Sequence, residues 1–196
     1  MTLTKTLVPA LLLAATLAPS TARADLKIGQ PAPDFSLPNA SDGKTLVALK
    51  PLLAKDKGVL VLFIATTCPV SNAYNERMAA LGRDFEPKGV AVIGVNANKS
   101  EHCAEISTHA AAHGLAFTIV KDDEAKVANL YGAQHTPEAF LVDAKGTLVY
   151  HGRIDDNRDE PAKVKSPDLR NALDALVAGK PIAVAETKAF GCSIKR

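Results

Sequence analysis

The chain of 196 residues is 47% hydrophobic and 22% charged, which suits a single domain with one core. Its formal net charge of +2 resides in Lys5 and Arg23. Removing these two from the 23 basic residues leaves 21, equal to the 21 acidic ones, and no basic cluster with interleaved aromatics argues for a nucleic-acid partner. Three cysteines are too few for a disulfide scaffold, and their odd number leaves at least one thiol without a partner inside the chain.

Residues 1–24 have the pattern of a secretory signal peptide. Lys5 gives a weakly basic start, and the apolar run 7–18 is too short to span a bilayer. A small-x-small cleavage site at 22–24 predicts Asp25 as the first residue of the mature protein. The alternative is an uncleaved anchor. The pattern predicts a periplasmic or secreted protein, in a compartment where disulfides form.

After this leader we expect one domain at 25–181 and a C-terminal tail at 182–196. The domain opens with a proline-punctuated segment, 28–49, in which Phe35 and Leu37 stand two apart and an Asp-Gly turn follows. This pattern predicts a β-hairpin laid across the front of the domain.

The segment GVLVLFIATTCPVSN at 58–72 combines a buried strand with the start of a helix. Pro69 suits the first helical position because it has no backbone N–H to satisfy, which places Cys68 at the N-cap. A sulfur there faces free N–H groups that stabilise a thiolate, so we predict a reactive thiol supported by Thr67 and Pro69. The alternative is a small buried hydrophobic residue.

The rest of the chain alternates between helix and strand patterns. The expected helices are an amphipathic one at 74–85, one at about 100–113 with Ser100 as N-cap, one at 125–131, and one that begins at Ser166 and Pro167 and ends before Gly179. The expected strands are 90–95, 117–120, 139–142 and 147–151, the last two joined by a hairpin turn. The tail has few helix or strand signals, and we expect Cys192 there to be exposed and mobile.

Alternation of strands and helices predicts an α/β fold with a mixed central sheet and helices on both faces. Ligand chemistry in such sheets gathers beyond the carboxyl ends of the parallel strands. Cys68 follows one of these ends directly.

Six segments in order, PAPDFSLP, FIATTCPVSNAY, KGVAVIGVN, YGAQHTPEAFLVDAKG, YHGRIDD and KAFGCSIKR, resemble the redoxin branch (peroxiredoxin-like, AhpC/TSA-type) of the thioredoxin superfamily. The resemblance covers residues 26–196. It implies a thioredoxin-like fold with an N-terminal β-hairpin and a thiol-dependent oxidoreductase, and no cofactor is predicted. The same fold serves peroxidases, disulfide reductases, metallochaperones and binding modules, so it does not decide the reaction.

Two departures from the family patterns bear on that reaction. Reductases of the superfamily carry Cys-x-x-Cys at the helix start, whereas Ser71 stands in the second cysteine's place. Peroxiredoxins carry Pro-x-x-x-Thr-x-x-Cys, whereas Val61 and Ala65 occupy the proline and threonine places and Thr67 is out of register. An intramolecular disulfide must therefore use a distant cysteine, and an efficient peroxidase is put in doubt.

Two further positions carry over from the resemblance. Thr136-Pro137 resembles the cis-proline element that faces the reactive cysteine and exposes backbone groups to an extended partner. The alternative is a trans proline at the start of a strand. Arg153 stands where peroxiredoxins place an arginine beside the reactive sulfur, although a surface arginine paired with Asp155 or Asp156 is favoured.

Cys192 is the predicted partner of Cys68. Cys103 has the spacing of some atypical peroxiredoxin resolving cysteines, but it lies near a helix start, and a disulfide needs Cα atoms within about 7 Å. An extended tail covers about 3.3 Å per residue and crosses the domain without rearrangement. Cys103 is then the odd thiol, while Cys103 or an external thiol stays open as the resolving group.

Three functions fit these patterns. The first is an exported thiol oxidoreductase with Cys68 as nucleophile, acting on a thiol or disulfide protein or a small peroxide and reset by an external thiol reductant. The second is a one-cysteine or atypical two-cysteine thiol peroxidase, and the third a non-catalytic binding module. No metal site is predicted, because His135 near Cys68 and His102 beside Cys103 supply too few ligands. No membrane span is expected after the leader.

Overall fold

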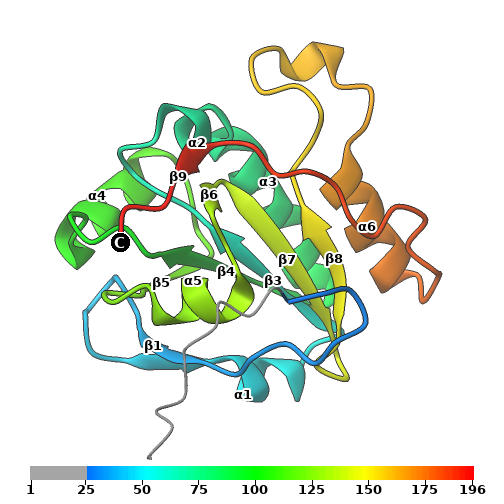
Figure 1. Cartoon of the computed structure of the whole chain (residues 1–196), viewed down its shortest axis with the longest axis horizontal. Coiled ribbons are helices and arrows are strands. Elements are labelled where there is room, and N and C mark those ends of the chain that lie inside the picture. Colours follow the sequence, from blue (N-terminus) through cyan, green and yellow to red (C-terminus); the bar gives the residue numbers. More distant parts are fainter. Residues whose placement is uncertain (1–25) are drawn as a thin grey trace, which may run out of the picture.

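The structure is a computed structural model that describes residues 26–196 (Figure 1). The predicted signal peptide at 1–24 and the mature start at Asp25 lie outside the described residues. A five-stranded sheet with the order β5-β4-β3-β7-β8 forms the centre. β3, β4 and β5 run parallel, and β7 and β8 are antiparallel to their neighbours, which confirms the mixed sheet. The strands are β3 (Gly58–Phe63), β4 (Val90–Asn96), β5 (Thr118–Lys121), β7 (Glu138–Asp143) and β8 (Leu148–Gly152).

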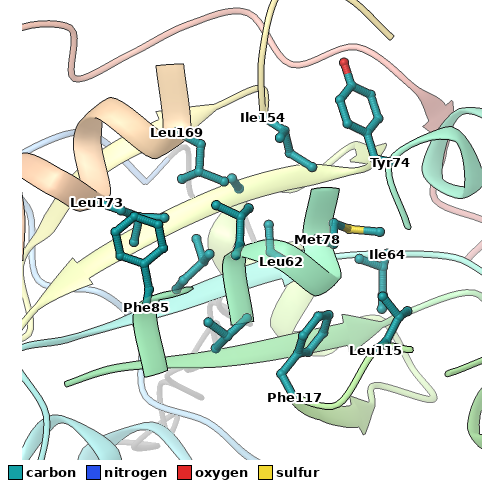
Figure 2. Packing of buried hydrophobic residues seen from close by; sticks show 14 of the residues in the cluster. Leu62, Ile64, Tyr74, Met78, Phe85, Leu115, Phe117, Ile154, Leu169 and Leu173 are labelled. Carbon is teal, nitrogen blue, oxygen red and sulfur yellow. The ribbon is translucent and has the colours of Figure 1, made fainter. Parts of the chain in front are cut away.

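The two faces of the sheet carry separate hydrophobic clusters, because side chains alternate along a strand. All of β3 is buried. Leu60 and Leu62 belong to one cluster, shown in Figure 2, where Leu62 lies among side chains contributed by the helices of that face. Val59, Val61 and Phe63 belong to the other cluster. The chain that leaves β3 toward Cys68 thus starts from the best-packed strand of the fold.

Helices cover both faces, as predicted. On the first face lie α3 (Asn75–Phe85), α4 (Cys103–Ala112) and α6 (Asp168–Val177), and on the second α1 (Leu49–Leu53) and α5 (Lys126–Tyr131). Three short helices complete the set: α2 (Pro69–Ala73), η1 (Glu86–Lys88) and η2 (Pro161–Lys163). Within the described residues, none of the helices has the length and apolar character needed to span a membrane.

The N-terminal hairpin is confirmed. Strands β1 (Ser36–Pro38) and β2 (Leu46–Ala48) pair antiparallel, with Leu37 opposite Val47. The extended segment was expected to run to Leu49, but Leu49 instead begins α1 and packs into the second cluster. Burial of this residue under the sheet decided its conformation.

Three helix starts differ from the sequence predictions by one to three residues. The helix expected at 74–85 begins at Asn75, because the Tyr74 N–H bonds back to the Ser71 carbonyl and closes α2 separately. α4 is capped by His102 rather than Ser100, and the Glu105 carboxylate accepts the His102 N–H at 3.1 Å. In α6 the N-cap is Pro167, not the residue before it.

The C-terminal tail is mostly irregular, in line with its few helix or strand signals, but Cys192, which was expected to be exposed, is partly buried. The tail contains the short strand β9 (Cys192–Ser193), which pairs antiparallel with β6 (His135–Thr136). In Figure 1 it is the red segment that leaves α6 and returns to α2 and β6. Ile194 is buried at 5% exposure, so the tail is packed at its far end.

Main-chain hydrogen bonds hold the tail at a second place, beside β8. The His151 N–H donates to the Ala185 carbonyl, and the Thr187 N–H donates to the His151 carbonyl. The Thr187 hydroxyl contacts the Tyr150 hydroxyl at 2.9 Å. Gly152 makes this approach feasible, since a Cβ there would lie 2.9 Å from the Thr187 carbonyl carbon. The tail is therefore held in place by backbone hydrogen bonds to distant segments. Such bonds leave no periodic pattern in the sequence of the tail.

Candidate active site

Cys68 lies at the N-cap of α2, as predicted. Its backbone is extended, with φ −86° and ψ 115°, and Pro69 is the first helical residue. The Ser71 backbone N–H points at the Cys68 sulfur at 3.3 Å. A donor in this position favours negative charge on sulfur, so the local geometry favours the thiolate over the thiol.

The sulfur of Cys68 is joined to that of Cys192, 124 residues further along the chain. The two Cα atoms are 5.9 Å apart, within the usual range for a disulfide. Cys103, the first residue of α4, is a free and partly buried thiol. The predicted pairing, with Cys103 as the odd cysteine, is confirmed.

The disulfide lies against the proline loop. The Thr136-Pro137 peptide bond is cis, as predicted. Thr136 pairs with Cys192 in the β6–β9 ladder, and its carbonyl oxygen lies 3.2 Å from the Cys68 sulfur. A disulfide sulfur carries no proton, so this is a contact in the oxidised protein. In the reduced protein the same oxygen can accept the Cys68 thiol proton. Cys68, Cys192 and the proline loop therefore form one site.

Ser71 and Thr67 have structural partners of their own. The Ser71 hydroxyl oxygen, fully buried, accepts the Ala65 backbone N–H at 3.3 Å. The Thr67 hydroxyl donates a hydrogen bond to the Glu101 carboxylate at 2.5 Å and therefore points toward that side chain. The serine that replaces the second cysteine of a local dithiol thus helps to hold the loop between β3 and α2.

Glu101 is a site residue that sequence reasoning missed. Its side chain is buried, with a 1% exposed fraction, and accepts the backbone N–H groups of Thr66 at 2.7 Å and Thr67 at 3.2 Å. Burial alone would raise its pKa, but the hydrogen bonds from Thr67, Asn98, Thr66 and Asn96 outweigh burial and lower the pKa to about 2. Glu101 is therefore an ionised carboxylate that holds the loop in front of Cys68. An acidic residue in a polar stretch usually faces water, so the sequence carried no signal for this role.

Asn98 connects that loop to the tail. Its side-chain nitrogen donates to Glu101 at 2.8 Å, and its side-chain oxygen accepts the Lys195 N–H at 2.8 Å. Its carbonyl accepts the buried Lys121 ammonium at 2.6 Å. The segment 96–101 therefore contacts both chain segments that supply the disulfide. The charge of Lys121 lies within the same network as the Glu101 carboxylate.

A second buried carboxylate, Glu138, holds the proline loop. It accepts the backbone N–H groups of Gln134 at 2.7 Å and His135 at 2.8 Å. It also contacts the His151 ring nitrogen Nε2 at 2.8 Å. Burial opposes ionisation, but these hydrogen bonds lower the Glu138 pKa. Through His151, whose ring lies 3.8 Å from the tail residue Glu186, the loop is connected to the tail.

Arg153 forms an ion pair, but with a residue other than those expected. Its guanidinium Nε forms an ion pair with Asp168 at 2.7 Å, and its backbone N–H donates to Thr187. Asp155, one of the acidic partners considered, pairs with Arg77 instead. Within the described residues, Arg153 makes no hydrogen bond or ion pair with Cys68. It joins β8 to α6 through an acidic partner, as the favoured interpretation expected, but this partner is Asp168 rather than Asp155 or Asp156.

Three buried polar atoms around the disulfide lack a hydrogen-bond partner in the described part of the chain: Asn72 Oδ1, His135 Nδ1 and Thr136 Oγ1. Buried polar groups are usually paired, so such atoms mark places that a water or a substrate completes. Over the same described residues, no three His, Cys, Asp or Glu side chains gather to hold a metal ion.

Known proteins of similar sequence carry names of two reaction types. Residues 28–151 match the model of the AhpC/TSA family. The thiol-disulfide oxidoreductase ResA of Halalkalibacterium halodurans is 32% identical over 93 residues, covering 47% of this chain and 52% of that protein. A Helicobacter pylori protein named as a peroxiredoxin, bcp, is 36% identical over 135 residues, covering 63% of this chain and 85% of that protein.

Solved structures share the fold. The crystal structure of a hypothetical protein from Sinorhizobium meliloti has a TM-score of 0.80 at 35% identity, and the match covers 88% of this chain and 96% of that one. The chain spans about half the length of the ResA relative, so the similarity to that protein is partial. The family match covers well over half of the chain. The chain therefore belongs to the AhpC/TSA family and has a thioredoxin-like fold.

Proposed function

We propose that the protein is an exported thiol-disulfide oxidoreductase in which Cys68 is the nucleophile and Cys192 the resolving cysteine. The observation that carries the proposal is the Cys68–Cys192 disulfide itself, which joins an N-cap sulfur to a strand paired with the cis-proline loop. A non-catalytic binding module would not require this pairing of a thiolate-favouring sulfur with a distant cysteine.

The reaction proceeds by two exchanges. The Cys68 thiolate attacks one sulfur of a substrate disulfide, forming a mixed disulfide and releasing the other substrate sulfur as a thiolate that takes a proton from water. The Cys192 thiolate then attacks the Cys68 sulfur and releases the second substrate thiol. The substrate gains two electrons, which the two cysteines lose. An external thiol resets the protein through Cys192, because Cys68 is only 3% exposed and Cys192 is more open.

Peroxide reduction is the second candidate, favoured by the similarity to the H. pylori protein. There the Cys68 thiolate would attack a peroxide oxygen, releasing alcohol or water and leaving a sulfenic acid. Cys192 would then displace water to form the same disulfide. Three features count against an efficient peroxidase. Ala65 stands in the place of the family's threonine and has no hydroxyl, and the nearby Thr67 hydroxyl donates to Glu101. Arg153, the counterpart of the family's arginine beside the sulfur, pairs with Asp168.

The test compares single-turnover oxidation of the reduced protein by glutathione disulfide and by hydrogen peroxide. We expect disulfides to react faster, Cys68→Ser to abolish both reactions, and Cys192→Ser to trap a mixed disulfide that mass spectrometry detects on Cys68. Cys103→Ser is the matched control and should react like the parent protein. A rate with peroxide that exceeds the disulfide rate a hundredfold would assign the protein to the peroxidases.

Export is a separate part of the proposal and rests on the pattern of residues 1–24. The mature protein should begin at Asp25 and be recovered from the periplasm or the medium. Intact-mass measurement of the native protein checks both points, and a product that retains residues 1–24 would contradict cleavage.

A further inference from the structure

We propose that the substrates are polypeptides whose reactive cysteine follows a glycine directly, with an aromatic residue two positions before the cysteine and an aliphatic residue two positions after it. This rests on the proposed function. The reason is that the protein's own tail pairs with β6 beside Cys68 in the manner of a bound polypeptide. We call the place that the tail occupies there the groove, and the contacts of the tail show which side chains fit it.

The tail is bound through its backbone, in a way that any extended chain can reproduce. His135 lies opposite Ser193 and Thr136 opposite Cys192, and the Ile194 N–H continues the ladder to the Gln134 carbonyl at 3.0 Å. Strand addition of this kind supplies affinity through main-chain hydrogen bonds and leaves specificity to side chains. The side chains of the occupant therefore decide which chains fit.

The position before the cysteine admits only glycine. A Cβ on Gly191 would lie 2.7 Å from the Thr136 carbonyl carbon and closer still to its oxygen. The obstacle is backbone rather than a flexible side chain, and it is the backbone of the loop that Glu138 holds. A partner with any larger residue there would have to displace this loop.

The positions two residues before and two residues after the cysteine are apolar and packed. Phe190 packs against Tyr74, with ring centroids 6.3 Å apart, and Ile194 is buried in the second cluster. Ser193 and Lys195, on either side of Ile194, are exposed and so leave the choice of side chain open. Tyr74 is itself held by a hydrogen bond to Asp155 at 3.0 Å, so it offers a fixed aromatic surface.

Tail and partner compete for the same groove. The reduced protein accepts the partner when the tail leaves β6, and Cys68 forms the mixed disulfide with the partner cysteine, releasing that cysteine's former disulfide partner as a thiol. The Cys192 thiolate then attacks the Cys68 sulfur as the tail returns to β6, and the partner leaves as a dithiol. Strand exchange and disulfide exchange thus occur together, and the partner disulfide gains the two electrons that Cys68 and Cys192 lose.

The test uses the full chain with Cys103→Ser and Cys192→Ser, so that Cys68 is the only thiol. The probe is a peptide with the sequence TKAFGCSIKR of residues 187–196, activated as a disulfide with 2-nitro-5-thiobenzoate, whose release is coloured. A second peptide carries alanine in place of its glycine. For each peptide, the rate constant with Cys68 is divided by its rate constant with glutathione, which removes differences in intrinsic reactivity. We expect this ratio to be about tenfold or more higher for the glycine peptide than for the alanine peptide.

Equal corrected rates for the two peptides would overturn the inference. Reaction of Cys68 with a small aromatic disulfide separates this failure from that of the proposed function. If Cys68 reacts with the small disulfide but does not discriminate between the peptides, only the substrate assignment fails. If Cys68 reacts with neither, both proposals fail.

A second variant removes the competing tail without truncation. Adding Gly191→Ala to the Cys68-only protein should expel its own tail by the same clash and accelerate reaction with the glycine peptide, whereas Ser193→Ala, at an exposed tail position, should not. An unchanged rate in the Gly191→Ala variant would show that tail and peptide use different surfaces. The parent protein is also examined for dimers in which Cys68 of one molecule is joined to Cys192 of another. Such dimers would show that the groove binds a second copy of the chain, and would overturn the proposal of a separate polypeptide substrate.

Discussion

The two halves of the disulfide are held in different ways. Cys68 follows the central strand β3 directly and is oriented by its own neighbours, Pro69 and the Ser71 N–H. Cys192 is brought to it by pairing with β6 and by the contacts of the tail with His151 and Asn98. The difference teaches that the geometry favouring a thiolate at Cys68 is built locally, whereas the pairing of Cys68 with Cys192 depends on distant contacts.

The segment 96–101 is where the two halves meet. Glu101 binds the loop before Cys68 through a buried, ionised side chain, while Asn98 binds the backbone of the tail. A substitution at Glu101 should therefore affect the Cys68 half first, and one at Gly191 should affect only the Cys192 half. Three variants test this division, in order from the largest expected effect to the smallest.

The largest effect is expected from Glu101→Gln. Thr66 and Thr67 donate their backbone N–H groups to different oxygens of the carboxylate. An amide replaces one of these oxygens by an NH2 group, so one N–H faces another donor, and the other N–H loses its charged acceptor. We expect the free energy of unfolding at pH 7 to fall by about 2–4 kcal/mol. Urea unfolding of the oxidised protein measures it. Glu105→Gln, at an exposed position of the same helix start, is the control and should lose about 1 kcal/mol or less.

The same variant has a defined pH dependence. Because the pKa of Glu101 is lowered from 4.5 to about 2 on folding, its stabilising effect is complete above about pH 4.5 and is lost as the pH falls toward 2. The gap in stability between the parent protein and Glu101→Gln should therefore narrow between pH 5 and pH 2. A gap that stays constant over this range would show that the carboxylate is not ionised in the folded state.

Gly191→Ala should weaken the Cys192 half alone. Its methyl group clashes with Thr136, so docking of the tail becomes less favourable while Cys68 keeps its local donors. We expect the equilibrium between disulfide and dithiol to shift about tenfold toward the dithiol, which is about 30 mV. Titration in glutathione buffers measures the shift, with Ser193→Ala as control. A slower alkylation of Cys68 in this variant would contradict the separation of the two halves.

The smallest effect on the site is expected from Arg153→Gln. Arg153 pairs with Asp168 rather than contacting the sulfur, so the rate at which iodoacetamide alkylates reduced Cys68 at pH 6.5 should change by less than about twofold. Stability should fall modestly, since Asp168 is buried and keeps only its contact with Ser166. A tenfold loss of Cys68 reactivity would restore the family role of this arginine and show that the reduced site is rearranged.

Much of the fold follows from short-range patterns. The buried run of β3, the steps of three and four in α3 and the turn residues of the hairpins are local signals, and the elements they predict are present. Element boundaries differ from the predictions at two places. Leu49 begins α1 and is buried instead of ending an extended segment, and His102 rather than Ser100 is the N-cap of α4. Local propensities differ by too little to resolve such choices.

The sequence by itself determined that Cys68 lies at a helix N-cap, because the proline after it and the preceding apolar strand lie within a few residues of one another. It also excluded a local dithiol, since Ser71 stands in the place of a second cysteine, and this left Cys192 and Cys103 as the possible partners within the chain. Only the tertiary structure decided that the tail becomes a strand on β6, that Glu101 is buried and ionised, and that Arg153 turns to Asp168. Each of these depends on groups far apart in the chain, and hydrogen bonds and burial between such groups leave no periodic trace in the sequence.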